Sequence, residues 1–203
     1  MLEVTKAVSS TLHLEEVLTL ISEQMVKAMG VDGCALSRWD QEADAVVTWI
    51  EFRRQDTEWA DEPGTTYALD DFPATRAVLE TRQPLAIHVS DPDADAAELA
   101  HMRKMESASL LMLPLAVGDW VVGLIELDQS EYERVFTAAE IRLCQALANQ
   151  AAIAIQNARL FKGIQNKAEE LGLLLDAATA VSSTLELDQI LRALAEKMST
   201  SMG

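Results

Sequence analysis

The sequence predicts an α+β fold with a mostly antiparallel sheet sandwiched by helices, and with long helices at its N- and C-terminal ends. Residues with helical and strand-like periodicity alternate in the order helix, two strands, helix, strand, helix, two strands, long helix. Short polar turns separate the paired strands, which favours antiparallel neighbours. The 203 residues, of which 49% are hydrophobic and 24% charged, have the composition of an ordinary globular domain.

The first third of the chain predicts a helix followed by a hairpin. The helix ends at Gly30, a residue type that commonly follows the last helical turn. Two strand-like runs, Cys34–Trp39 and Ala45–Phe52, are joined by a polar stretch suited to a tight connection. Residues 54–72 are acidic and contain a Pro-Gly turn, so we expect them to form an exposed loop.

Three short elements are expected next. A helix covers Ala74–Thr81, a strand covers Pro84–Val89, and a second helix runs to about Met105. Pro73 suits the first turn of a helix because its missing N–H needs no partner there. Either Asp93 or Asp95 is suited to cap the second helix.

The clearest hairpin of the chain pairs Ser109–Val117 with Trp120–Leu127 through a Gly118-Asp119 turn. Pro114 indicates an edge or a bulge in the first of these strands, since proline cannot donate a backbone hydrogen bond.

A long final helix is predicted from Ile141 to at least Phe161. Thr137 and Glu140 stand just before it with the spacing of a capping box. No linker rich in Gly and Pro follows, so we expect the helical pattern to continue.

The two ends of the chain repeat each other. Ala7–Leu12 returns unchanged as Ala180–Leu185, and both copies open an amphipathic helix. We therefore expect residues 1–162 to form one complete domain, residues 163–179 a coiled-coil signalling helix, and residues 180–203 the first helix of a second, truncated domain.

The charge balance restricts the partners. The net charge is −17, which disfavours nucleic acid and an anionic membrane surface as partners. No apolar run reaches the roughly 18 residues of a spanning helix, and the N-terminus does not resemble a signal peptide, so a cytoplasmic location is expected. Cys34 and Cys144 lie far apart in apolar stretches and are interpreted as buried thiols.

Several motifs in the second half of the complete unit follow one another in a familiar order: Ser109–Leu115, a Gly-Asp turn, Val122–Leu127, Phe136–Glu140 and Leu147–Leu160. Together they resemble a GAF domain, a small-molecule-sensing module of bacterial signalling proteins. The resemblance covers about residues 7–162, and residues 180–203 resemble the start of a second copy. It implies a GAF/PAS-like sandwich in which the terminal helices share one face of the sheet, often as a dimer, and the ligand pocket occupies the other.

The ligand classes known for this family fit the sequence poorly. Members that bind cyclic nucleotides carry an Asn-Lys pair where this chain has Asp128 and Gln129; only Phe136 and Glu140 match, and core packing and helix capping account for both. Bilin-binding members attach the chromophore through a cysteine near residues 100–103, where this chain has no thiol. Bilins and cyclic nucleotides are therefore disfavoured, and the cofactor is left unknown.

Three further sites are weaker alternatives. Haem ligation would require His88 or His101. The simpler interpretation is that His88 is a hydrogen-bonded core residue and that His101 is exposed to solvent. A calcium loop at Asp91–Asp95 lacks the required Gly and Glu. Reduction of free methionine sulfoxide, known in this family, needs more cysteines than Cys34 and Cys144 supply.

The residues expected to line a pocket mix apolar and polar types: Trp39, Phe52, Phe72, Arg76, His88, His101 and Met105. Arg76 stands near the start of a short helix, where backbone amides and a guanidinium together suit a small carboxylic acid or amino acid.

No catalytic motif is found in the sequence, so no catalytic residues are assigned. A heptad pattern runs from the long helix into the second copy. Its a and d positions include Ile153, Asn157, Leu160, Ile164, Lys167, Leu171, Leu174, Ala178 and Val181. Two polar residues in this series favour an interhelical seam of specified register, so we expect a parallel homodimer.

The sequence therefore predicts a non-enzymatic regulatory sensor domain of a bacterial signal-transduction protein, of two-component type, that binds a small molecule and relays its state through a dimeric helix. By resemblance, the output domain would be a histidine kinase, a cyclic-dinucleotide enzyme or a transcription activator. The alternatives are a ligand-free dimerisation spacer and, less favoured, a free methionine sulfoxide reductase.

Overall fold

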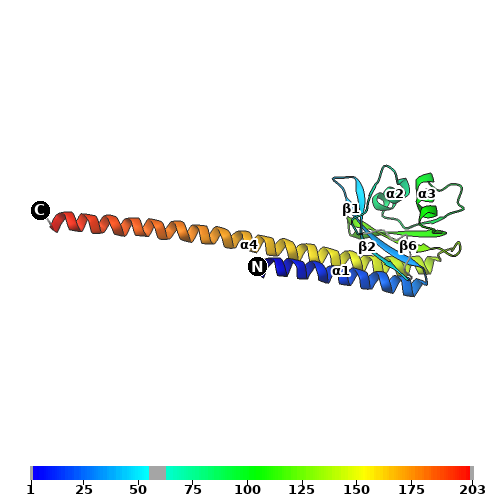
Figure 1. Ribbon diagram of the computed structural model, residues 1–203, viewed down its shortest axis with the longest axis horizontal. Coiled ribbons are helices and arrows are strands. Elements are labelled where there is room, and N and C mark those ends of the chain that lie inside the picture. The colour runs from blue at the N-terminus through cyan, green and yellow to red at the C-terminus, as the bar shows by residue number, and fades with distance from the viewer. Residues whose placement is uncertain (1, 55–62, 202–203) are drawn as a thin grey trace. The chain divides into compact units, whose positions relative to one another are not determined.

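A single antiparallel sheet of six strands organises the domain, in the order β3-β2-β1-β6-β5-β4. The computed structural model describes the backbone of residues 2–54 and 63–201, and the side chains of residues 14–54 and 63–179. The strands are β1 (Gly33–Asp40), β2 (Ala45–Arg53), β3 (Thr66–Ala68), β4 (Leu85–His88), β5 (Ser109–Val117) and β6 (Trp120–Gln129). The predicted fold class, an antiparallel sheet between helices, is confirmed (Figure 1).

Helices cover both faces of the sheet. They are α1 (Leu2–Met29), α2 (Pro73–Thr81), α3 (Ala96–Lys104) and α4 (Ala138–Ser201). In Figure 1, α1 and the beginning of α4 lie along one face, and α2 and α3 along the other. Contacts divide the chain into two compact units, Met1–Ala158 and Arg159–Gly203, and the second unit consists of the continuation of α4.

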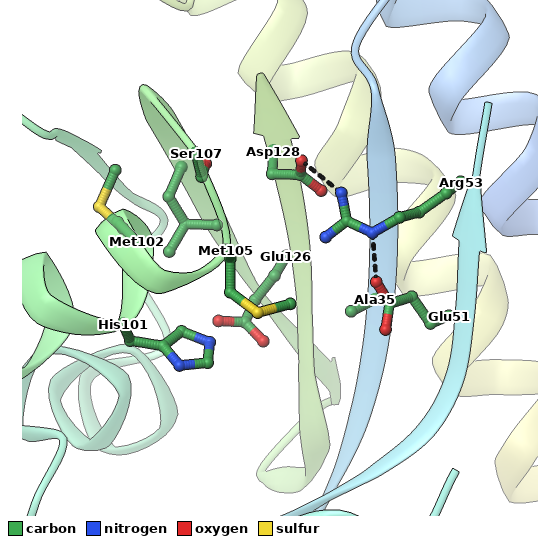
Figure 2. A pocket seen from close by; sticks show the side chains of 10 residues that line it. Ala35, Glu51, Arg53, His101, Met102, Met105, Ser107, Glu126 and Asp128 are labelled. Atoms are coloured by element: carbon green, nitrogen blue, oxygen red, sulfur yellow. Dashed lines mark hydrogen bonds and ion pairs between the residues drawn. The ribbon is translucent and has the colours of Figure 1, made fainter. Parts of the chain in front are cut away.

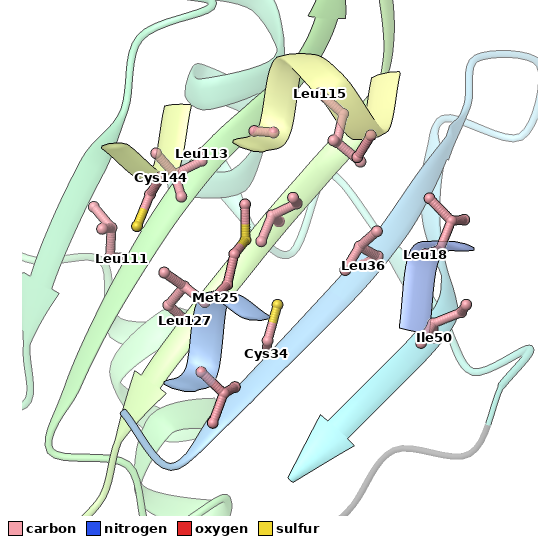
Figure 3. Close-up of a cluster of buried hydrophobic side chains, with 14 of the residues drawn as sticks. Leu18, Met25, Cys34, Leu36, Ile50, Leu111, Leu113, Leu115, Leu127 and Cys144 are labelled. Carbon is pink, nitrogen blue, oxygen red and sulfur yellow. The ribbon is translucent and has the colours of Figure 1, made fainter. Parts of the chain in front are cut away.

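The main hydrophobic core lies between the sheet and the pair α1 and α4 (Figure 3). Its fully buried members come from every layer, for example Met25 of α1, Leu36 of β1, Leu111 of β5 and Leu127 of β6. Small residues of α4 (Ala148, Ala151 and Ala152) are also fully buried, which allows this helix to approach the sheet closely. Each large side chain buried here contributes about 1.5–3 kcal/mol of transfer free energy.

A second hydrophobic cluster lies on the opposite face, beneath α2 and α3. Val78 and Leu79 of α2, Met102 of α3, and Met112 and Leu124 of the sheet belong to it. Successive strand residues point to opposite faces, so one strand supplies both clusters. The sheet is therefore the common wall of the two halves of the domain.

Helix ends agree with the sequence analysis. Gly30 follows α1 with φ 66°, a left-handed conformation that glycine adopts without strain. Pro73 is the first residue of α2. Asp95, one of the two predicted caps, accepts hydrogen bonds from the backbone N–H groups of Ala97 and Glu98 at 2.9 and 3.2 Å. Before α4, Thr137 N–H donates to Glu140 Oε2 at 2.7 Å and Glu140 N–H to Thr137 Oγ1 at 3.3 Å, which is the predicted capping box.

Two details of the sheet differ from the expectation or refine it. The segment 54–72 was expected to be loop throughout, but Thr66–Ala68 forms β3 and pairs with Ala45–Val47. This strand has only three residues, too few for a periodic pattern, and its partner is distant in sequence. The pairing of β5 with β4 extends only from Ser109 to Met112, so β5 has no β4 partner at Pro114 and is an edge strand there. An irregularity in the register with β6 follows between Leu115 and Ala116.

Glycine is required at position 123, where β6 lies opposite Arg38 of its antiparallel neighbour β1. A Cβ atom added to Gly123 would lie 1.9 Å from the carbonyl oxygen of Ser37 and 2.9 Å from Cα of Arg38. Both contacts are to backbone, which cannot move without disturbing the pairing of β1 with β6. This pairing joins the first and last strands of the domain.

Within the part of the chain that the structure describes, every helix falls short of the combined length and apolar character needed to cross a lipid bilayer.

Candidate functional site

A cavity of about 40 Å³ lies between the sheet and the C-terminal end of α3. This volume holds a few water molecules, because one water needs roughly 10–15 Å³ on this measure. Strand residues form the floor, and α3 with the segment after it forms the opposite wall (Figure 2). The lining residues are Ala35, Glu51, Arg53, His101, Met102, Met105, Ser107, Leu110, Glu126 and Asp128.

The polar wall of the cavity is built around Arg53, at the end of β2. Its Nε donates to Glu51 Oε1 at 2.6 Å, and its Nη1 donates to Asp128 Oδ2 at 3.1 Å. The three side chains are largely shielded from water, with 12%, 7% and 10% of their surface exposed for Arg53, Glu51 and Asp128. In Figure 2 the guanidinium lies between the two carboxylates, on the side of the cavity opposite Met105.

Burial and charge act in opposite directions on this ion group. Burial raises the pKa of Asp128, and the nearby Arg53 opposes that shift without cancelling it. For Arg53, burial alone would lower the pKa, but Asp128 and Glu51 more than offset it and the pKa is raised. Arg53 therefore stays charged. Its charge is shared between two carboxylates, and Glu126 adds a third carboxylate to the lining.

The strands that line the cavity also contribute side chains to the core beneath α1 and α4. On β6, Glu126 and Asp128 face the cavity, whereas Ile125 and Leu127 belong to the cluster beneath α1 and α4. At the start of β1, a Cβ added to Gly33 would lie 2.2 Å from Asp128 Oδ1, so a larger residue there would displace this carboxylate from its present position. A change at the cavity wall is thus one residue away from the contacts of the terminal helices.

Two of the residues predicted to line a pocket do so, namely His101 and Met105. Phe72 lies beside them rather than in the lining: the rings of Tyr67, Phe72 and His101 pack edge to face, with centroids 5.1–5.7 Å apart. Such contacts fix the orientation of the His101 ring.

The structure does not bring the remaining candidates into the cavity. Trp39 packs against the cluster beneath α2 and α3, and its buried Nε1 has no hydrogen-bond partner in the described part of the chain. Phe52 packs on the other face of the sheet, with the α1 and α4 core. His88 stands at the end of β4, where its Nδ1 is 3.1 Å from Ser109 Oγ.

Arg76 is engaged with the protein's own acids. Its two terminal nitrogens contact both carboxylate oxygens of Asp44, at 3.2 and 2.7 Å, and one of them also contacts Asp70 at 2.9 Å. Glu80 lies 3.8 Å away. A free carboxylic acid would reach this guanidinium only by displacing one of these partners.

The sequence analysis did not single out Glu51, Arg53, Glu126 or Asp128. Charged residues that alternate with apolar ones along a strand usually indicate a face in water. A buried polar cavity differs from such an exposed face here because the alternation occurs on β2 and β6, the two strands that flank β1. That arrangement depends on the pairing of segments distant in sequence, which the sequence alone does not reveal.

Metal and thiol chemistry find little support in the described residues. No group of three or more His, Cys, Asp or Glu side chains among them is arranged to hold a metal ion. Cys34 and Cys144 are both free and buried. Burial raises the pKa of both thiols, that of Cys144 to about 11, so neither carries the thiolate that attack on a sulfoxide would need.

Fold and cavity together define a class of protein: an α+β domain whose antiparallel sheet carries terminal helices on one face and a polar cavity under short helices on the other. A sequence model described as "GAF domain" matches residues 13–155. The chain belongs to the GAF domain family.

Comparison with curated proteins gives regulatory relatives. The formate hydrogenlyase transcriptional activator FhlA of Escherichia coli is 24% identical over 181 residues, which cover 83% of this chain and 24% of FhlA. The formate hydrogenlyase transcriptional activator of Salmonella typhimurium gives the same identity and coverage. The chain thus spans about a quarter of the length of the curated relatives it matches.

Solved structures agree on the fold. The blue-light-absorbing form of the Thermosynechococcus elongatus PixJ GAF domain superposes with a TM-score of 0.65 at 16% identity, over 79% of this chain and 94% of that one. The phycoerythrobilin-bound GAF domain from a cyanobacterial phytochrome gives 0.64 at 18% identity, over 78% and 93%. At this level of identity the likeness establishes the fold alone.

Proposed function

We propose that this chain is a non-enzymatic sensory domain of a signal-transduction protein, which binds a small molecule in the cavity beside α3 and passes the bound state to α4. The observation that carries the proposal is the shared strand β6. Asp128 and Glu126 line the cavity, while Leu127 between them packs in the core of the terminal helices. A ligand that moves the first pair shifts the second set of contacts, since a packed core transmits strain.

The charge of the lining favours a ligand with a cationic group. Three carboxylates and one arginine leave an excess of negative charge, and Arg53 already contacts two of the acids. The described residues offer no metal-binding cluster, so the cation we propose is organic, such as an amine whose apolar part contacts Met102, Met105 and Leu110. The same charge disfavours cyclic nucleotides, as the sequence analysis expected.

The output route we propose is a parallel homodimer formed along α4. The expected seam residues that the structure describes are exposed within one chain, including Leu160 at 59%, Ile164 at 68% and Leu171 at 57%. Ile153 and Leu174 are 47% and 60% exposed, and Asn157, Lys167 and Ala178 are exposed as well. The side chain of Val181 lies outside the described residues. A two-stranded coiled coil would bury this apolar series.

The regulatory relatives support the same proposal. FhlA and its Salmonella counterpart are transcriptional activators of which this chain matches about a quarter. We therefore propose an output domain in the longer protein, a transcription activator being one candidate.

A ligand-free dimerisation spacer is the second candidate, and the small cavity favours it. A volume of about 40 Å³ is below that of typical small-molecule pockets. In this case the charged groups of the lining would satisfy one another, as Arg53, Glu51 and Asp128 do.

Native mass spectrometry of the freshly purified protein, followed by thermal-shift screening, tests the proposal. Small amines should raise the melting temperature, and Glu126→Gln should abolish the shift while Glu131→Gln, an exposed carboxylate outside the lining, should preserve it. Met105→Trp should fill the cavity and block binding. If no amine, amino acid, organic acid or cyclic nucleotide binds, and Met105→Trp stabilises the domain, the spacer is the correct assignment.

A further inference from the structure

The cavity beside α3 is smaller than the ligand class proposed for it. Its volume is about 40 Å³, which suits a few water molecules, whereas an amine with an apolar part needs more space. We propose that residues 103–107, at the C-terminal end of α3, form a lid over this cavity, with Glu106 as its hinge, and that the lid is closed in this structure. The inference rests on the proposed function for its ligand, but the motion of the lid is measurable without one.

The hinge residue has an unusual backbone conformation. Glu106 has φ 52°, in the left-handed region. Around it, Ser107 N–H donates to the Met102 carbonyl oxygen at 2.8 Å, and Glu106 N–H donates to the Arg103 carbonyl oxygen at 3.2 Å. These two bonds form a Schellman motif, which ends a helix with a left-handed residue that is usually glycine. The Cβ of a glutamate crowds the following carbonyl oxygen in this conformation, so the backbone is strained at the wall of the cavity.

The chain is anchored on both sides of the lid. Before it, Met102 is 1% exposed and belongs to the cluster beneath α2 and α3. After it, Ala108 N–H donates to the Gln129 carbonyl oxygen at 2.8 Å, and the Ala108 carbonyl oxygen accepts from Val89 N–H at 2.9 Å. Between these anchors, three of the five lid residues have exposed side chains. A rotation at Glu106 therefore moves a short segment while the sheet and the rest of α3 stay in place.

Opening of the lid enlarges the cavity because the lid supplies part of its wall. Met105 and Ser107 line the cavity, and Figure 2 shows Met105 on the side opposite the Arg53 guanidinium. The bond from Ser107 N–H to α3 requires the left-handed conformation of Glu106. When Glu106 leaves this conformation, the bond breaks and Met105 is released from its place over the cavity. A ligand too large for the closed cavity binds only the open fraction, so the lid equilibrium sets the apparent affinity.

Hydrogen exchange at the Ser107 amide measures the hinge directly. In the native protein this amide should exchange much faster than the amides of the central strand β6, which report global unfolding. Glycine adopts the left-handed region freely, so Glu106→Gly should favour the closed lid and slow exchange at Ser107 about fivefold. A β-branched residue is disfavoured there, so Glu106→Val should accelerate the exchange by at least about fivefold.

Binding of n-butylamine, an amine with a short apolar chain, tests the consequence for the cavity. Glu106→Gly should bind it about fivefold more weakly than the native protein, because the open fraction falls by that factor. Arg82→Gly is the matched control. Arg82 also has a left-handed backbone, with φ 58°, but it ends α2 and pairs with Asp119 outside the cavity. Its replacement relieves a comparable strain and should leave both exchange at Ser107 and amine binding unchanged.

Two results would overturn the lid. One is the same exchange rate at Ser107 in the native protein, Glu106→Gly and Arg82→Gly. The other is a Ser107 amide that exchanges only as slowly as the amides of β6, since it would then open only by global unfolding. If n-butylamine and larger amines bind none of the three proteins, the proposed ligand is wrong, and the exchange rates still decide whether the lid opens.

Discussion

Asp128 concentrates the electrostatic constraints of the candidate site in one side chain. Its side chain is 10% exposed, Oδ2 accepts a hydrogen bond from Arg53 Nη1 at 3.1 Å, and Oδ1 occupies space that a Cβ on Gly33 would otherwise take. Its carboxyl group is needed to partner Arg53, yet burial disfavours the charge that makes it a good partner. These opposing effects give a dependence of stability on pH that can be measured.

We predict that Asp128→Asn destabilises the domain by about 1 kcal/mol, since an amide replaces the carboxyl group that accepts the hydrogen bond from Arg53 Nη1. The folded-state pKa of Asp128 is raised above its usual value, so the folded protein binds the proton more tightly than the unfolded chain. That contribution to stability is present at pH values below the usual Asp pKa and is lost as the pH rises through the folded-state pKa. Urea denaturation should therefore show a larger gap between native protein and variant at about pH 4 than at about pH 7.

Asp119→Asn is the matched control for that measurement. Asp119 is fully exposed and contacts only Arg82 at 2.8 Å among the described side chains, so its removal should change stability little at any pH. A gap between native protein and Asp128→Asn that widens as the pH rises would contradict the assigned direction.

The two cysteines make a second prediction at the residue scale. Both thiols are buried in the core shown in Figure 3, and burial raises the pKa of Cys144 to about 11. Labelling by a thiol reagent should therefore be at least about a hundredfold slower in buffer than in denaturing urea, because it requires local or global opening. Rapid labelling of either thiol in the native protein, together with turnover of free methionine sulfoxide, would revive the reductase alternative.

At the scale of elements, side-chain hydrogen bonds on both sides of the helix cap hold the beginning of α4. Thr137 and Glu140 exchange hydrogen bonds, and Glu140 also accepts from Arg134 Nη2 at 2.6 Å. Arg134 in turn donates to the carbonyl oxygen of Met29, the last residue of α1. One arginine thus connects the end of α1 to the start of α4, the two helices that share a face of the sheet.

Thr137→Ala should lower the free energy of unfolding by about 1 kcal/mol, the usual effect of losing a helix cap. Glu140→Ala should have a larger effect, because it also removes the partner of Arg134. Thr179→Ala is a suitable control: this threonine is exposed within α4, and its hydroxyl bonds only to the Leu175 carbonyl oxygen in the described structure. Chemical denaturation of the three variants tests the prediction, and equal effects of Thr137→Ala and Thr179→Ala would refute it.

The helix caps could be predicted from sequence because each depends on residues a few positions apart. Gly30, Asp95 and the Thr137–Glu140 pair all belong to this class. The strand β3 could not, since three residues carry no period and the strand exists through its pairing with β2.

The candidate site was harder to predict than the fold. Arg53 and Asp128 are 75 positions apart, and the pairing of β1 with both β2 and β6 brings them together. Their alternation with apolar residues resembles that of an exposed face, and only the covering by α3 makes it internal. His101 and Met105 could be predicted because they belong to that short helix and the residue that ends it.

At the scale of the whole molecule, α4 belongs to both compact units of the chain. Its first part contributes Cys144, Ala148 and Ile155 to the core of the domain. Its continuation, in the second compact unit, exposes a run of large apolar side chains that includes Leu171, Leu173, Leu174 and Leu175. Exposed apolar surface of this extent usually marks an interaction site.

The heptad register selects which of these leucines face a partner helix. Leu171 and Leu174 occupy a and d positions, whereas Leu173 occupies a c position, on the outer side of the helix. We predict that Leu171→Glu and Leu174→Glu each weaken dimerisation at least about tenfold, because a charge would be buried in the seam. Leu173 is more exposed in the single chain than Leu171 and Leu174, at 72% against 57% and 60%, yet Leu173→Glu should leave the dimer intact.

Truncation near Phe161 completes the test of the seam, because it removes every a and d position beyond Leu160 while keeping the core contacts of α4 up to Ile155. Sedimentation equilibrium should give a dimer for the full chain and a weaker association constant for the truncated one. An unchanged constant would place the interface on α1 and the first part of α4 instead. In that case the exposed leucines of the continuation would have another partner. A structural change at the cavity would then be transmitted to the dimer interface through the core of the domain, without the continuation of α4.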